Sequence, residues 1–500
     1  MITKRTLLIA STALAGVAAL GTASLAADFT GTVTIVHIND VHAHIDGTDT
    51  QIGYPKIAGF VEQTRAENPN TLFLDAGDAI AGDPYASIDR GLGFLPILNT
   101  LGIDAMTAGN SEFAYGSDHL KTFAAGLNYP LLVDNMVYTA TGEPFSEGFT
   151  LVELPNGMTA GIVGVTTHQS GVMASTDLEY VDAVAATERL VGEATEAGAD
   201  FIVGLLHLGE LEEDSNSLAV AEQVEGLDVI IDGNSHTGHP SGLIHNDVLI
   251  AQTSGNGETV GVVDLAFVDG KFTGAEARLL DRASLDNVPE KAATRAALDV
   301  FLATATEFFN EIVGSTDVTL EGTRDVVRTQ ETNLGNLFTD AVREAAGAQL
   351  AFLPAGYIGG VTEPGPIDRR TVQTMARIEV EIVKMELTGE QVVAFVDSTV
   401  GTFPESSGSL LHVSGGTYRI DPDAEGTKAH SFTVEGAPLS PEDTYSVAVV
   451  VGALSRPGIS EGTLISRHGN TPQILEAYLK ANSPVAPQVE GRFGAATKAE

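Results

Sequence analysis

The chain has 500 residues and a formal net charge of −41, with 43% hydrophobic and 19% charged residues. The length exceeds one ordinary hydrophobic core and the composition is that of a globular protein, so we expect two domains. The acidic excess argues against nucleic acid or an anionic membrane surface as a partner, because basic patches recognise both.

The first residues resemble an export signal. Lys4 and Arg5 precede a mostly apolar run at 7–20, and the sequence SLA at 24–26 places small residues before a cleavage site. The pattern predicts a Sec-type signal peptide over 1–26 and a periplasmic or secreted protein. A membrane anchor is the alternative, but the apolar run is short for a span, and no other segment is long and apolar enough. The chain has no cysteine, which excludes lipid attachment through cysteine and disulfides.

From Gly31 to about Leu280, apolar β-rich runs alternate with helical stretches, which predicts a largely parallel sheet covered by helices. The predicted strands are Thr32–Ile38, Thr71–Leu74, Ala105–Thr107, Phe201–Leu206 and Val229–Ile231. The predicted helices include Tyr54–Glu67 and Val181–Gly198. Ala251–Gly270 contains two β runs around glycine-rich turns and predicts an antiparallel end to this domain.

Residues 283–313 have no strand pattern and predict a helical connector. A second α/β domain then runs over 314–500, after a first domain at 27–282. Its clearest element is Asn333–Ala348, whose apolar residues lie on one helical stripe. Thr332 is the predicted N-cap of that helix.

Polar residues follow the predicted strands of the first domain. In open α/β sheets, ligands bind at the carboxyl ends of the strands, so these residues predict a site. They are Asp40, His42, Asp75, Asp78, Asn110, His207, Asp232, Asn234 and His236.

Carboxylate, neutral imidazole and amide oxygen together favour Zn, Mn or Fe over Ca. Two such ions that share a carboxylate can hold a phosphoryl oxygen and activate water. A single His or Asp after a strand is more often a loop residue or a helix cap. It is hard to explain five strands that all end in such residues as five separate loop residues or helix caps. The pattern therefore predicts a metal centre for phosphoester hydrolysis.

The sequence resembles the 5'-nucleotidase family, which joins a calcineurin-like metallophosphoesterase domain to a 5'-nucleotidase C-terminal domain. The resemblance covers nearly the whole chain after the signal and implies a layered αββα domain, the connector and a second α/β domain. The motifs that carry it, in the family's order, are NDVH (39–42), LDAGD (74–78), GNSEFAYG (109–116), LLHLG (205–209), DGNSH (232–236), VRTQETNLGNLFTDA (327–341) and LHVSGGTYRID (411–421).

The resemblance implies two divalent metal positions. The first would be held by Asp40, His42, Asp78 and His236, with Asp78 bridging to the second. The ligands implied for the second position are Asp78, Asn110, His207 and Asn234. Because Asn234 stands where the family has a histidine, we expect one strong site and one weakened site.

The sequence departs from the family at positions that act on the substrate. The family's His–Asp pair, which stabilises the reacting phosphate, is replaced by Ser111 and Ala114. No residue of this chain is therefore assigned a catalytic acid–base role. Three histidines next to the blocks that face the site are candidate auxiliary groups: His44, His168 and His239.

The second domain departs as well, and its substrate-binding residues stay unassigned. The family's loop with a phosphate-binding Arg corresponds to Leu353–Gly360, which contains no arginine. The segment Gly452–Gly462 lacks the family's base-stacking aromatic residue, although Arg456 lies in it.

Two hypotheses follow. In the first, the protein is an exported metal-dependent phosphoester hydrolase of nucleotide catabolism, acting on a nucleotide-like or other small phosphorylated substrate with reduced or altered activity. In the second, it is a non-catalytic descendant that binds metal or ligand. Family membership favours the first, whereas the loss of substrate-contacting residues in both domains favours the second.

Overall fold

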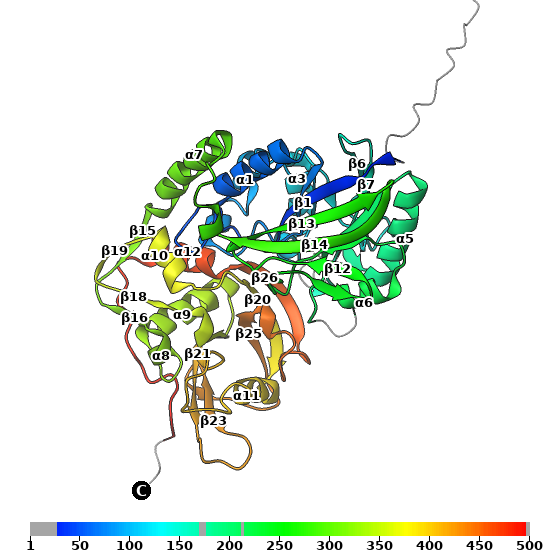
Figure 1. Cartoon of the computed structure of the whole chain (residues 1–500). Helices are drawn as coiled ribbons and strands as arrows, with labels where there is room; N and C mark the ends of the chain where they lie inside the picture. Colours follow the sequence, from blue (N-terminus) through cyan, green and yellow to red (C-terminus); the bar gives the residue numbers. More distant parts are fainter. Residues whose placement is uncertain (1–27, 170–176, 212–214, 497–500) are drawn as a thin grey trace, which may run out of the picture. The chain divides into compact units, whose positions relative to one another are not determined.

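The structure is a computed structural model that describes residues 28–169, 177–211 and 215–496 (Figure 1). The predicted signal peptide at 1–26 lies outside the described residues. The chain divides into two compact units between Leu302 and Ala303. The division falls inside α7 (Ala292–Phe309), the long helix that follows the short turn η5 (Ala283–Leu285).

The N-terminal unit contains two six-stranded sheets (Figure 1). The first has the order β14-β13-β1-β2-β3-β4, in which β1 to β4 are parallel and β13 is antiparallel to both of its neighbours, β1 and β14. Its strands are β1 (Gly31–Ile38), β2 (Thr71–Asp75), β3 (Ala105–Thr107), β4 (Leu131–Leu132), β13 (Thr259–Val268) and β14 (Lys271–Asp281).

The second sheet has the order β11-β12-β10-β9-β7-β6, with antiparallel strands only at its two edges. Its strands are β6 (Phe149–Glu153), β7 (Thr159–Thr166), β9 (Phe201–His207), β10 (Val229–Ile231), β11 (Leu243–His245) and β12 (Val248–Ala251). A separate two-stranded ribbon joins β5 (Met136–Tyr138) and β8 (Leu178–Tyr180).

The two sheets share one buried apolar core. Val33 and Leu74 of the first sheet pack in the same cluster as Val203 and Ile231 of the second. The outer face of the second sheet is covered by α5 (Ala183–Glu196) and α6 (Ser217–Gln223). The first sheet is flanked by α1 (Tyr54–Glu67), which packs on β2, and by α3 (Ser117–Gly126). This arrangement confirms the expected αββα layering.

The five strands that end in polar residues belong to two sheets, not to the one largely parallel sheet that the alternation suggested. β1, β2 and β3 lie in the first sheet, whereas β9 and β10 lie in the second. A strand that is buried on both faces has a continuous apolar sequence whichever sheet contains it. The sequence pattern therefore could not show which of the two sheets each strand joins.

The C-terminal unit is built on a five-stranded sheet of order β21-β17-β25-β20-β26, packed against α9. The predicted N-cap of α9 is confirmed: the Thr332 side chain accepts a hydrogen bond from the Gly335 N–H. The sheet strands and main helices are β17 (Leu350–Pro354), β20 (Glu381–Thr388), β21 (Leu411–Ser414), β25 (Thr444–Val450), β26 (Thr463–Asn470), α9 (Asn333–Ala346), α10 (Arg369–Met375), α11 (Gly389–Asp397) and α12 (Thr471–Asn482).

The short helix α8 (Arg324–Val327) precedes α9. The smaller strands of this unit are β15 (Ile312–Thr316), β16 (Leu320–Gly322), β18 (Gly360–Thr362), β19 (Gly365–Asp368), β22 (Gly416–Ile420), β23 (Ala429–Val434) and β24 (Ala437–Pro438). They form two two-stranded ribbons and one three-stranded sheet.

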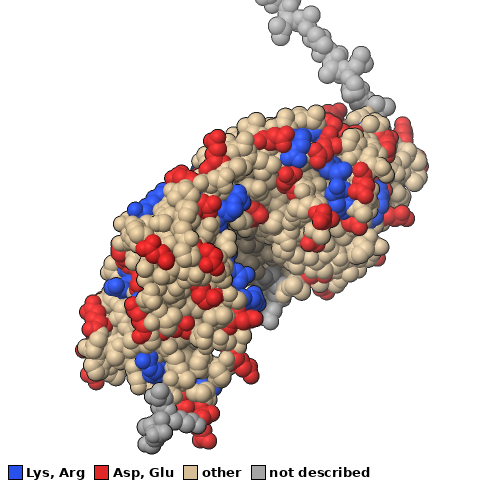
Figure 2. All heavy atoms as spheres, turned by 90° about the vertical axis from the view of Figure 1, so that its left-hand side faces the viewer, with Lys and Arg blue, Asp and Glu red and all other residues tan. Residues whose placement is uncertain are grey.

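The surface carries the acidic excess of the sequence. On the face shown in Figure 2, Lys and Arg side chains lie interspersed with Asp and Glu side chains. Within the described part of the chain, no helix has both the length and the apolar character needed to cross a bilayer.

Candidate metal centre

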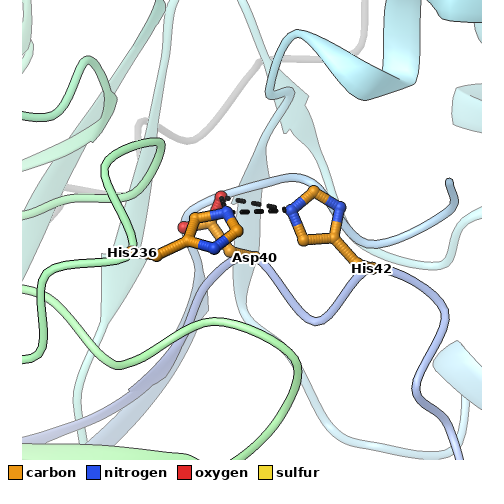
Figure 3. Close-up of side chains that lie close together, drawn as sticks. All are labelled: Asp40, His42 and His236. Carbon is orange, nitrogen blue, oxygen red and sulfur yellow. Dashed lines mark hydrogen bonds and ion pairs between the residues drawn. The ribbon is translucent and has the colours of Figure 1, made fainter. Parts of the chain in front are cut away.

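Asp40, His42 and His236 form the first ligand cluster, and their side chains point toward one another (Figure 3). Asp40 and His42 follow β1, and His236 follows β10. The His236 Nε2 lies 3.3 Å from the Asp40 Oδ1 and 3.0 Å from the His42 Nε2. The His42 Nε2 lies 3.8 Å from the same carboxylate oxygen. One carboxylate and two imidazoles that converge in this way suit a divalent ion such as Zn or Mn.

Asp40, Asp78 and His207 form a second cluster directly beside the first. The His207 Nε2 lies 3.6 Å from the Asp78 Oδ1 and 3.9 Å from the Asp40 Oδ1. The other oxygen of Asp78, Oδ2, lies 3.7 Å from the His42 Nε2. Asp78 therefore faces a histidine of each cluster, which is the placement a bridging carboxylate requires.

The His207 Nε2 is the observation that most directly indicates a metal. The ring is fully buried, and this nitrogen has no hydrogen-bond partner among the described residues. A buried polar atom without a partner is costly, and this one faces two carboxylates. A divalent cation between them would satisfy all three groups, so the residues fit a bound metal.

Hydrogen bonds fix the orientation of two of the histidines. The Nδ1 of His42 lies 2.9 Å from the Ala81 carbonyl, and the Nδ1 of His207 lies 2.6 Å from the Ala76 carbonyl. A carbonyl oxygen only accepts, so each Nδ1 donates and each Nε2 is the nitrogen that faces the clusters, available to a metal once it carries no proton. Metal-binding histidines are commonly held in this way.

The ligand loops adopt backbone conformations that most residues avoid. Asp40, His42, Asp78, Asn234 and His236 all have positive φ, between 49° and 77°. Such strain persists only where the surrounding structure enforces it, and it gathers at functional sites.

Gly109 provides space for the same cluster. A Cβ atom at this position would collide with the carboxylate of Asp78 and lie 2.6 Å from the His207 ring. A side chain there would therefore displace two of the candidate ligands.

Of the two candidate amide ligands and the two substituted positions, Asn234 contacts Asp40 through its backbone N–H and Ser111 contacts Asp78. The Asn234 side chain donates from Nδ2 to the Leu208 carbonyl at 2.9 Å, which leaves its amide oxygen available as a ligand. Asn110 precedes the 3-10 helix η4 (Ser111–Tyr115), whose Ser111 Oγ donates to the Asp78 Oδ2 at 2.9 Å. Ala114 is exposed on the same short helix.

Glu112 is a buried residue beside the clusters that the sequence reasoning did not single out. Its carboxylate is fully buried and accepts hydrogen bonds from four backbone N–H groups, at distances between 2.7 and 3.2 Å. Burial, the largest influence, and the nearby Asp78 carboxylate raise the pKa of Glu112. The donors belong to Asp78, Ala79, Ile80 and Gly109.

None of the three candidate auxiliary histidines belongs to either ligand cluster. The His44 Nδ1 lies 3.7 Å from the Asp83 carboxylate. The His239 Nε2 is bound to Glu210 at 2.5 Å. His168 is exposed beside the ring of Tyr180. Each of them thus has a local interaction outside the clusters.

The charge balance of the metal-free cluster favours a bound cation. Burial lowers the pKa of His207, but the carboxylates of Asp78 and Asp40 outweigh it and raise that pKa to about 9. A proton therefore occupies His207 at neutral pH when no metal is bound, and a metal ion must displace it.

We expect metal affinity to increase about tenfold for each pH unit between about pH 7 and 9, because one proton leaves His207 as the metal binds. Calorimetry of Mn binding in two buffers of different ionisation enthalpy measures this proton release. About one proton per ion at pH 7.5 is the expected result. Binding without proton release at that pH would contradict the assignment of His207 as a ligand.

Two protein families match successive parts of the chain. The calcineurin-like phosphoesterase family matches residues 33–238, which include both ligand clusters. The 5'-nucleotidase C-terminal domain family matches residues 312–453.

Several known proteins are similar over most of this chain. The trifunctional nucleotide phosphoesterase protein YfkN of Bacillus subtilis is 28% identical over 92% of this chain, but the match spans only 35% of YfkN. The 5'-nucleotidase of Vibrio vulnificus is 25% identical over 94% of both chains.

Two solved structures share the fold over nearly the whole chain. The 5'-nucleotidase precursor of Thermus thermophilus is 26% identical, with a TM-score of 0.63, and covers 94% of this chain and 100% of its own. The putative 5'-nucleotidase of Staphylococcus aureus has a TM-score of 0.73 at 18% identity over 93% of this chain and 100% of its own, which shows the fold alone. With its metallophosphoesterase clusters in one unit and the matching C-terminal domain in the other, this chain belongs to the 5'-nucleotidase family.

Proposed function

We propose that this protein is an exported, divalent-metal-dependent phosphoester hydrolase of the 5'-nucleotidase type, acting on nucleotide-like substrates at a reduced rate. The observation that carries the proposal is the convergence of Asp40, His42, Asp78, His207 and His236, with the His207 Nε2 buried and without a partner among the described residues. That set favours a transition-metal site.

The site is better equipped to bind a metal than to carry out acid–base catalysis. A divalent metal held by these ligands supplies a Lewis acid for a phosphoryl oxygen. Ser111 donates to Asp78 and orients that carboxylate. A serine hydroxyl is neutral at physiological pH, so it cannot supply the positive charge that a protonated histidine would place beside the reacting phosphate. The described contacts therefore support metal binding more strongly than they support proton transfer to or from a substrate.

The alternative is a non-catalytic protein that binds metal or a phosphorylated ligand. The specific observation in its favour is that none of the candidate auxiliary histidines His44, His168 and His239 belongs to either ligand cluster.

A phosphatase screen of the purified protein separates the two functions. Mn, Zn, Co and Mg would be added in turn, with nucleotides, UDP-sugars and generic phosphoesters as substrates. Slow phosphate release that requires a metal and stops with chelator supports the hydrolase. No release with any metal, from protein that retains bound metal, would favour the binding protein.

The same ligands predict unequal metal occupancy. We expect one tightly held ion at Asp40, His42, Asp78 and His236, and a weaker second one, because the Asn234 amide is a poorer ligand than imidazole for Zn. Elemental analysis after dialysis measures the ratio of metal to protein. The Asn234→His variant should retain a second equivalent. Two equivalents in the natural protein, or none, would contradict this expectation.

Export is predicted from the sequence at 1–26, outside the described residues. Cleavage after Ala26 would give a chain that starts at Ala27. Intact-mass measurement of the native protein tests this directly. A mass that includes Met1, found together with membrane retention, would overturn it.

A further inference from the structure

Three buried oxygen atoms of the N-terminal unit have no hydrogen-bond partner among the described residues. They are the Asp75 Oδ2 and the hydroxyl oxygens of Tyr54 and Tyr129. None of the three residues is more than 8% exposed. Asp75 is the last residue of β2 and one of the polar residues at the strand ends, but it belongs to neither ligand cluster. The metal centre therefore leaves its carboxylate without a role.

The three side chains gather on the helix-covered face of the first sheet. Leu74 packs in the core between the two sheets, so the next residue, Asp75, points to the opposite face. Tyr54 begins α1, which packs on β2, and Tyr129 lies two positions before β4 of the same sheet. Burial, the largest influence, and then the Asp75 carboxylate raise the pKa of both tyrosines. The carboxylate is thus close enough to act on both hydroxyl groups.

Hydrogen bonds connect Asp75 to the loops that carry the metal ligands. The Asp75 Oδ1 accepts from the Gly77 N–H at 3.0 Å. The Gly77 carbonyl accepts in turn from the Asp40 N–H at 2.8 Å, and the next residue in the chain is Asp78. The Asp75 side chain therefore holds a peptide group that lies between two candidate ligands.

A water molecule fits the three oxygens better than a cation does. Buried water typically makes about three hydrogen bonds to polar groups that otherwise lack a partner, and it both donates and accepts. A cation that prefers oxygen, such as Ca²⁺, takes about six or more oxygen ligands. Two neutral phenols and one carboxylate oxygen are too few for it. The nearby Glu112 carboxylate does not complete such a set, because four backbone N–H groups already bind it.

We propose that Tyr54, Asp75 and Tyr129 enclose one internal water molecule that hydrogen-bonds to all three side chains. Asp75 is then a positioning residue, because the water holds its Oδ2 while the Gly77 N–H holds its Oδ1. Together they fix the turn at 75–78, which carries Asp78. The water site goes beyond the proposed function, whereas its effect on metal binding rests on Asp78 being a ligand.

A crystal structure of the natural protein, grown with Rb⁺ as the monovalent cation, identifies the occupant. We expect one ordered water about 2.5–3.0 Å from each of the three oxygens, without an anomalous signal from Rb⁺. An Rb⁺ peak at this position would overturn the choice of water. Direct hydrogen bonds among the three side chains, or no density between them, would overturn the site itself.

Removal of one hydroxyl group distinguishes a shared water from hydroxyl groups that are simply unpaired. With a shared water, Tyr54→Phe and Tyr129→Phe should each lower the midpoint of urea unfolding, because the water and Asp75 lose a partner. Unpaired hydroxyl groups would give the opposite result, a higher midpoint, because a costly buried group is removed.

The double variant tests whether the two tyrosines share one site. Tyr54→Phe combined with Tyr129→Phe should lose less than the sum of the two single losses, since the second change acts on a site that is already disrupted. Tyr180→Phe is the matched control, because the Tyr180 hydroxyl binds the Ser215 hydroxyl elsewhere in the same unit. Its loss should add to that of Tyr54→Phe. Additive losses for Tyr54 and Tyr129 would contradict a shared water.

Mn titration tests the positioning role of Asp75. Asp75→Leu should weaken Mn binding about tenfold or more, because the partners of metal ligands typically contribute about 10- to 100-fold in affinity. Asp75→Asn should retain most of the affinity, since an amide can still bond to the water and to the Gly77 N–H. A thermal melt identifies any variant that has unfolded. Natural Mn affinity in folded Asp75→Leu protein would overturn the positioning role.

None of these readouts requires catalysis, so the outcomes separate this inference from the proposed function. A water bound by all three residues, in a protein that hydrolyses no phosphoester, would support the water site and contradict the proposed function. A metal-dependent hydrolase whose Tyr54→Phe and Tyr129→Phe variants both unfold at a higher urea concentration would support the proposed function and overturn the water site.

Discussion

Replacing Ser111 by His together with Ala114 by Asp should raise the hydrolysis of 5'-nucleotides by about two to four powers of ten, the usual contribution of a positioned acid–base group. Both positions lie in the 3-10 helix η4, where residues three apart stand on the same face. Ser111 already contacts the Asp78 carboxylate through its hydroxyl and its N–H. A histidine there would start beside the metal ligands, and an aspartate at 114 could orient it.

Single replacements provide the control for this gain. Ala114→Asp alone should change little, because no imidazole is present for it to orient. Ser111→His alone should give a partial gain. Phosphate release from AMP with saturating Mn measures all of the variants. A double variant no faster than the natural protein, with its metal content intact, would show that these two positions do not limit the rate.

Replacing Glu112 by Gln should weaken metal binding about 10- to 100-fold and lower stability by about 3 kcal/mol or more. The carboxylate accepts from four backbone N–H groups around Asp78 and Gly109. A glutamine offers one acceptor oxygen and turns its own N–H₂ toward donors, so several N–H groups would lose their partner. The loop that holds Asp78 at positive φ would then relax.

Urea unfolding and Mn titration measure the two effects separately. Glu188→Gln is the control, because Glu188 is exposed on α5 of the same unit. If Glu112→Gln retained the natural metal affinity while losing stability, Glu112 would be a folding residue with no part in positioning the metal ligands.

The sequence predicted the strands and helices well because both depend on residues that are close together in the chain. A run such as TVTIVHI predicts a buried strand, and β1 spans Gly31–Ile38. The end of a strand is also a local feature, and Asp40, Asp78 and His207, which the structure brings into one cluster, lie at or shortly after strand ends. Which sheet a strand joins depends on contacts between distant segments, and the pairing of β7 with β9 has no counterpart in the local pattern.

What the sequence did not reveal about the site also depends on contacts between residues that are far apart in the chain. Glu112 stands beside Phe113 in the sequence and resembles an ordinary helix residue, yet it binds a loop more than thirty positions away. The three candidate auxiliary histidines were chosen by nearness in sequence, which does not determine where a ring points.

The most direct test of the central proposal is the rate of phosphate release from an activated aryl phosphate, measured with Mn for the natural protein and for Asp78→Asn. Asp78 faces histidines of both clusters, so its loss should remove metal-dependent activity altogether. We predict a slow, chelator-sensitive rate in the natural protein and none in the variant. Equal rates in the two proteins, or no activity in the metal-loaded natural protein, would contradict the proposal that this centre hydrolyses phosphoesters.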